Sequence, residues 1–111
     1  MSAADALESA QRAITVRAWQ TNRARAAELA GLAADWRRSG VLTAEGRARA
    51  RAVAHSIRGS AGTFGYPDAS LAAEELEATL DAVAADGSPN LVEALVDRID
   101  AALAREPGRE D

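Results

Sequence analysis

The sequence predicts an all-α protein, an antiparallel up-and-down four-helix bundle with an additional N-terminal helix, in one domain that spans residues 1–111. Aromatic residues make up only 4% of the chain, and no segment alternates apolar and polar residues with the period of two that strands show. Apolar residues recur instead at helical spacing, in segments separated by glycine, proline and capping residues. The length of 111 residues fits one domain.

The first helical region is long and alanine-rich. It runs from about Asp5 to Arg38 and ends at Ser39-Gly40, since glycine often follows the last residue of a helix. Thr21-Asn22 can cap a second helix, so we expect the region to break there into two helices. The two apolar stripes on either side of this point are Leu7, Ile14 and Ala18, and Leu29, Leu32 and Trp36.

Thr43 is a good N-cap, and it predicts a helix that runs to Phe64. Gly65-Tyr66-Pro67-Asp68 then predicts a stop and a new cap at Asp68, for a helix that ends before Asp86-Gly87. The stripe of this helix is Ala69, Ala72, Leu76, Leu80 and Val83.

Ser88-Pro89 predicts the start of the last helix, with serine as the N-cap and proline at the first helical position. Its stripe is Leu91, Val92, Leu95, Val96, Ile99 and Leu103. Residues 106–111 contain proline and glycine, so we expect a frayed tail. Phe64, Trp19 and Trp36 are expected in the core, and an off-stripe Leu71 is a candidate docking contact.

Composition limits the functions that are open to this chain. The net charge of −4 argues against a nucleic-acid partner, because phosphate binding needs a cationic surface. Without cysteine and with one histidine, the chain has a poor ligand set for a structural metal site, and we expect none. It has no long apolar run and no signal-like start, so we expect a cytoplasmic protein with no membrane partner. We also expect a monomer.

His55 is the only histidine, and its place on its helix decides what it can do. At about 100° per residue it lies roughly 200° from Val53, so it should face solvent. The core stripe of this helix is Val53, Ile57, Ser60 and Phe64, whereas the face of His55 also carries Arg51, Arg58, Gly59 and Gly62.

The two glycines on this face suggest that space is kept free. Each costs roughly 1 kcal/mol relative to alanine within a helix. Gly59 and Gly62 leave the imidazole accessible to another surface, and Arg58 can reach an anion attached to the ring. Neutral imidazole is a nucleophile at cytoplasmic pH, so this face suits phosphoryl acceptance.

The segment from Ala54 to Gly65, AHSIRGSAGTFG, resembles the histidine-containing phosphotransfer (HPt) domains of two-component relays. The family pattern is His, two residues, Lys or Arg, Gly, small residues and a later Gly, and Leu76-Glu77 matches the usual Leu-Glu of the following helix. Arg58 stands where the family commonly has lysine. The detailed match covers about 24 residues, 54–65 and the stretch up to Leu76-Glu77.

The resemblance implies that His55 accepts a phosphoryl group from a receiver-domain aspartyl phosphate and passes it to another receiver. Response-regulator receivers or a hybrid sensor histidine kinase are the implied partners. The chain would then be no enzyme and would need no cofactor, since the receiver supplies magnesium. Two alternatives stay open: the phosphoacceptor domain of a chemotaxis-type kinase, phosphorylated from ATP by a separate domain, and a helical adaptor that is never phosphorylated.

Overall fold

The computed structural model describes residues 2–108, and this part of the chain is helical and contains no strand. The all-α prediction is therefore confirmed. The four helices are α1 (Ala3–Ser39), α2 (Ala44–Thr63), α3 (Pro67–Ala82) and α4 (Asn90–Ala102).

Helix α1 is one continuous helix of 37 residues. It begins at a capping box, in which Ser2 and Asp5 bond each other's backbone N–H groups, and it ends at Gly40, whose φ of 79° is in the left-handed region. The predicted break at Thr21-Asn22 is wrong. Asn22 is 1% exposed, and its side chain bonds Ser60 of α2 instead of capping a helix.

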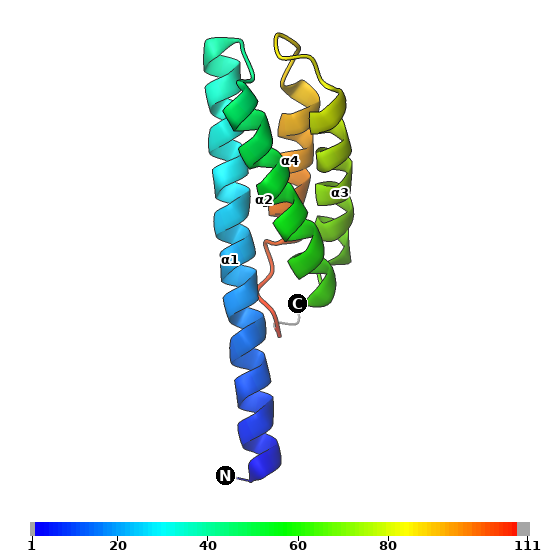
Figure 1. The fold of residues 1–111 in the computed structure, drawn as a ribbon. Helices are drawn as coiled ribbons and strands as arrows, with labels where there is room; N and C mark the ends of the chain where they lie inside the picture. Colours follow the sequence, from blue (N-terminus) through cyan, green and yellow to red (C-terminus); the bar gives the residue numbers. More distant parts are fainter. Residues whose placement is uncertain (1, 109–111) are drawn as a thin grey trace.

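The chain reverses direction at each connection, and the α1–α2 and α3–α4 connections lie at the same end of the molecule (Figure 1). A hydrogen bond of 2.8 Å from Leu42 N–H to the Ala85 carbonyl joins these two connections. Each helix packs against two others, in the cyclic order α1, α2, α3, α4. The four helices thus enclose one core.

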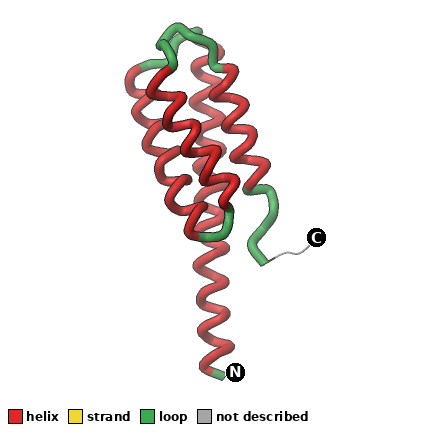
Figure 2. The backbone as a smooth tube through the Cα atoms, turned by 90° about the vertical axis from the view of Figure 1, so that its right-hand side faces the viewer, coloured by secondary structure: helices red, strands yellow, loops and turns green. Residues whose placement is uncertain are grey.

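The N-terminal part of α1 extends well beyond the other three helices (Figures 1 and 2). Leu7 and Ile14 on this extension are 60% and 58% exposed, so the expected first stripe does not enter the core. Trp19 marks the edge of the bundle, where its indole N–H donates to the Leu103 carbonyl at 2.7 Å. What we expected as a separate N-terminal helix is therefore the extension of α1.

The starts of the last two helices differ by about a residue from the prediction. Helix α3 begins at Pro67 with Tyr66 as the N-cap, so Asp68 lies in the first turn and is not the cap. Helix α4 begins at Asn90 with Pro89 as the N-cap, and the Ser88 hydroxyl accepts from the Asn90 N–H at 3.1 Å. Thr43 caps α2 as expected, accepting from the Gly46 N–H.

The core combines a few large side chains with many alanines, which lets the helices approach closely. Phe64 and Leu91 are exceptions to the predicted core, and Trp19, Leu32 and Val83 are only partly buried against it. Phe64 is half-buried because α2 ends there, so helical register no longer sets its direction. Leu91 is 60% exposed and lines an open groove beside the end of α3. The largest fully buried apolar residues are Leu29, Trp36, Ile57, Leu76, Leu80, Ile99 and Leu103.

The chain beyond α4 lies beside the connection between α2 and α3 as far as it is described. The Tyr66 hydroxyl donates to the Arg105 carbonyl at 2.7 Å, and Glu106 and Pro107 are half-buried. The remainder of the tail expected to fray, residues 109–111, lies outside the described residues.

Candidate functional site

His55 lies on the outer face of α2. Val53, Ala54 and Ile57 of the same helix are buried in the core, whereas 74% of the His55 side chain is exposed. The helical register of α2 therefore presents the imidazole to solvent, as the sequence predicts.

Glu77 of α3 contacts the imidazole from the side of the bundle. The His55 Nδ1 atom lies 3.3 Å from Glu77 Oε2, and the Glu77 side chain is only 14% exposed. An ionised carboxylate can only accept a hydrogen bond, so this contact favours the proton on Nδ1. In that tautomer the lone pair is on Nε2, the ring nitrogen that does not contact Glu77.

Arg58 lies one helical turn after His55, and its guanidinium is placed between two carboxylates of α3. Nη1 is 3.7 Å from Glu77 Oε1, and Nη2 is 3.7 Å from Glu74 Oε1. Glu77 Oε1 is buried and has no hydrogen-bond partner. The Glu77 carboxylate thus faces His55 with one oxygen and Arg58 with the other.

Arg51 completes a ladder of contacts between three basic side chains of α2 and three carboxylates of α3. Its Nε atom lies 2.7 Å from Asp81 Oδ1. Along α2, four residues separate Arg51 from His55 and three separate His55 from Arg58. Their partners on α3 have the same spacings, but their residue numbers run in the opposite order. Two helices that run in opposite directions place such positions side by side. The partners are Asp81, Glu77 and Glu74, in that order.

The two glycines of this face have different surroundings. A Cβ added at Gly59 would meet no atom within 4 Å, so this position is open to solvent. A Cβ at Gly62 would lie 3.1 Å from Ser70 Oγ of α3, and that hydroxyl donates to the Arg58 carbonyl at 2.7 Å. We expected both glycines to clear space for the imidazole. The structure places Gly62 instead at a close approach of α3, because its missing side chain would point at Ser70.

All five residues expected at the site lie on α2, and the structure adds the acids of α3 that pair with them. Glu77 is expected from the sequence only as part of the family pattern, and Glu74 and Asp81 are not expected from it. Their spacing along α3 matches the spacing of the three basic residues of the ladder along α2, and this match is visible in the sequence. The five expected residues are Arg51, His55, Arg58, Gly59 and Gly62.

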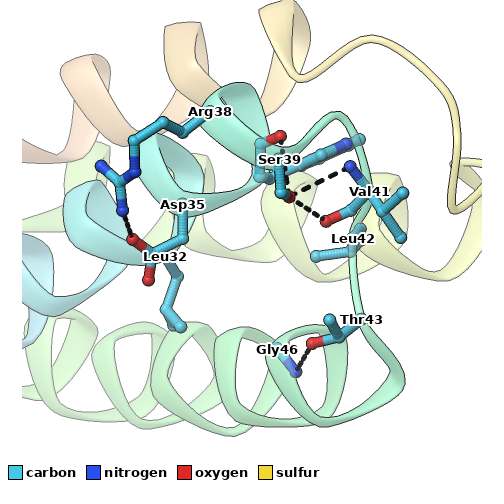
Figure 3. Close-up of a pocket in the computed structure, with 9 residues that line it drawn as sticks. Leu32, Asp35, Arg38, Ser39, Val41, Leu42, Thr43 and Gly46 are labelled. Atoms are coloured by element: carbon cyan, nitrogen blue, oxygen red, sulfur yellow. Dashed lines mark hydrogen bonds and ion pairs between the residues drawn. The ribbon is translucent and has the colours of Figure 1, made fainter.

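Residues 2–108 also form open pockets that His55 does not line. These residues contain no group of three or more His, Asp or Glu side chains arranged to hold a metal ion. An open pocket of about 450 Å³ lies where α1 turns into α2 (Figure 3). Local hydrogen bonds join residues that line this pocket: the Val41 N–H donates to Ser39 Oγ, and the Gly46 N–H donates to Thr43 Oγ1. Thr43 lies roughly 18 Å from His55 along the axis of α2, so the pocket is separate from the histidine.

The fold and this face together define a class of protein, helical bundles that present one histidine on the surface of a helix. A model of the Hpt domain family matches residues 1–105. The chain therefore belongs to the Hpt domain family, whose members carry out histidine phosphotransfer in two-component relays and interact with receiver domains and kinases. Neither a protein of curated function nor a solved structure gives a significant match to the chain. No helix within residues 2–108 is long and apolar enough to span a bilayer.

Proposed function

We propose that His55 accepts a phosphoryl group on Nε2 from the aspartyl phosphate of a receiver domain and passes it to a second receiver. The observation that carries this proposal is the contact between Glu77 and Nδ1 of an otherwise exposed imidazole. It orients the ring and leaves the nucleophilic lone pair on the nitrogen opposite the contact.

The chemistry of the step follows from this tautomer. The Nε2 lone pair attacks phosphorus, the P–Nε2 bond forms, and the bond between phosphorus and the aspartyl oxygen breaks, so the aspartate leaves as a carboxylate. The ring keeps its Nδ1 proton and gains a positive charge. Glu77, 3.3 Å away, is placed to stabilise that charge. In the return step the second receiver's aspartate attacks phosphorus, and the neutral imidazole is the leaving group.

The chain supplies a positioned nucleophile and a docking surface, and the receiver supplies the magnesium and its acidic pocket. The protein is thus a relay intermediate and not an enzyme on its own. Arg58 and Arg51 flank the imidazole on either side along α2, where they can contact the phosphoryl group or the receiver. Gly59 keeps the surface next to His55 free for the approaching domain.

The test is a transfer screen with receivers from the same organism, each phosphorylated and then mixed with the parent protein. Transfer of acid-labile label to His55 supports the proposal. Labelling only by a kinase domain with ATP would favour a chemotaxis-type phosphoacceptor instead, and no labelling from either source would favour an adaptor.

Gly59→Leu serves as the control for docking. The added side chain lies about one turn from His55, so transfer from a receiver should fail by exclusion. Labelling by acetyl phosphate, a small donor, should change much less, because it needs no docking surface. Equal transfer from a receiver in the parent and in Gly59→Leu would show that this face does not dock the receiver.

A further inference from the structure

Arg58 is held less tightly than the other arginine of the ladder, which bears on what happens once His55 is phosphorylated. Its two contacts, to Glu77 and Glu74, are both 3.7 Å long. These distances exceed hydrogen-bonding range, so both are ion pairs without a hydrogen bond. The Arg51–Asp81 contact is 2.7 Å. Arg58 can therefore move at little cost, whereas Arg51 would have to give up a shorter contact.

The two partners of Arg58 differ in how well water can replace the arginine. Glu77 is 14% exposed and its Oε1 atom is buried without a hydrogen bond, so withdrawal of Nη1 would leave that oxygen without a cation. Glu74 is 54% exposed, so water can solvate its carboxylate when Nη2 withdraws. Of the two contacts, the one between Nη2 and Glu74 is easier to break.

We propose that Glu74 holds Nη2 of Arg58 in the unphosphorylated protein and releases it to the phosphoryl group on His55, whereas Nη1 remains at Glu77. This inference rests on the proposed function of His55. A phosphoryl group carries up to two negative charges and three acceptor oxygens, so it outcompetes one exposed carboxylate. His55 and Arg58 are three residues apart on one helix face, which places the new partner within reach.

In this arrangement Glu74 is a positioning residue that acts through Arg58. It competes for the cation that stabilises the phosphoryl dianion, and so it keeps the phosphohistidine from becoming too stable to transfer onward. Replacement of Glu74 by an uncharged residue should strengthen the contact between Arg58 and the phosphoryl group.

The experiment phosphorylates the protein with phosphoramidate, whose P–N bond breaks as the P–Nε2 bond forms and ammonia leaves. The ³¹P chemical shift of the phosphohistidine is then followed against pH. A stronger contact with Arg58 stabilises the dianion and lowers the midpoint of this titration. Glu74→Gln should lower it by about 0.2 to 0.7 pH unit, the size expected for one exposed ion pair.

Two further variants identify the cause. Glu75→Gln makes the same charge change on the same helix, but Glu75 pairs with Arg98 at 3.0 Å, so the midpoint should stay at the parent value. In an Arg58→Ala background, Glu74→Gln should have almost no effect, because the cation for which Glu74 competes is gone.

The outcomes separate this inference from the function on which it rests. An equal shift in both backgrounds would mean that Glu74 acts on the phosphoryl group directly, and no shift in the parent background would mean that it does not act at all. Either result overturns the inference and leaves His55 as the phosphoacceptor. Failure of both phosphoramidate and a phosphorylated receiver to label the parent protein at His55 overturns the proposed function, and the inference with it.

Discussion

The Nδ1 atom of His55 and the Oε2 atom of Glu77 are 3.3 Å apart, and they connect the exposed face of α2 to a largely buried carboxylate of α3. Neither residue alone fixes the state of the imidazole. Under the proposed function, the pair selects Nε2 as the ring nitrogen that would react, and Glu77 provides a negative charge for the cation that would form.

Glu77→Gln tests this role. The amide keeps the shape of the side chain but removes the charge, so we expect phosphoryl acceptance from acetyl phosphate to slow by about tenfold, the size of a lost hydrogen bond to a charged group. ¹⁵N NMR of the ring should show Nε2 unprotonated in the neutral parent protein and a mixture of tautomers in the variant. Unchanged rate and tautomer would show that Glu77 does not position the histidine.

Gly59→Ala and Gly62→Ala form a matched pair for stability. Gly59→Ala should raise the free energy of unfolding by up to about 1 kcal/mol, because the new methyl group meets open space and alanine favours the helix. Gly62→Ala should gain less or lose stability, because the methyl group displaces the Ser70 hydroxyl from the Arg58 carbonyl. Urea unfolding measures both. In a Ser70→Ala background the two substitutions should have similar effects, and a persistent difference would point to another cause.

Asn22→Ala should lower the free energy of unfolding by roughly 1–3 kcal/mol, because it removes a buried amide that bonds Ser60 at 3.0 Å and Arg25 at 2.9 Å. Thr21→Ala is the control. Thr21 is exposed within α1, so this variant should unfold within about 0.5 kcal/mol of the parent. The reverse order of effects would indicate a helix cap at Thr21 and a break in α1.

The contact between α1 and α4 should weaken in acid. Hydrogen bonds from Arg37 hold the pKa of the Glu93 carboxyl below its usual value of 4.5. A carboxyl whose pKa is lower in the folded state stabilises the fold above its unfolded pKa, and this contribution is lost as the pH falls through the folded pKa. Glu93→Gln should therefore reduce stability at pH 7 and have little effect at pH 3 in urea unfolding. Arg37→Gln should lose the same pH-dependent contribution and also its hydrogen bond to Asn90, which persists in acid. An effect of Glu93→Gln that does not change with pH would contradict the assignment.

The helical segments and most of their ends could be predicted, because caps, glycines and prolines act locally. That α1 is one continuous helix could not be predicted. Asn22 carries the same local signal as an N-cap, and only its burial against Ser60 of α2 shows that it is a tertiary contact. Leu7 and Ile14 have core spacing, yet no other helix reaches them.

The exposed face of α2 could be predicted from periodicity alone, because the angle of His55 follows from its distance to Val53. The contacts of that face with the acids of α3 could not be predicted, since they depend on how α3 is aligned with α2. Gly59 and Gly62 illustrate the difference. They look equivalent on α2, but Ser70 of the neighbouring helix approaches only Gly62.

The most direct test of the account is labelling of the parent protein and of His55→Gln with a phosphorylated receiver. His55 is exposed, so the variant should keep the helical circular dichroism spectrum and an unfolding free energy within about 0.5 kcal/mol of the parent. The account predicts acid-labile label on the parent protein, attached to Nε2 of His55, and none on the variant. Label retained by a folded His55→Gln protein would contradict it.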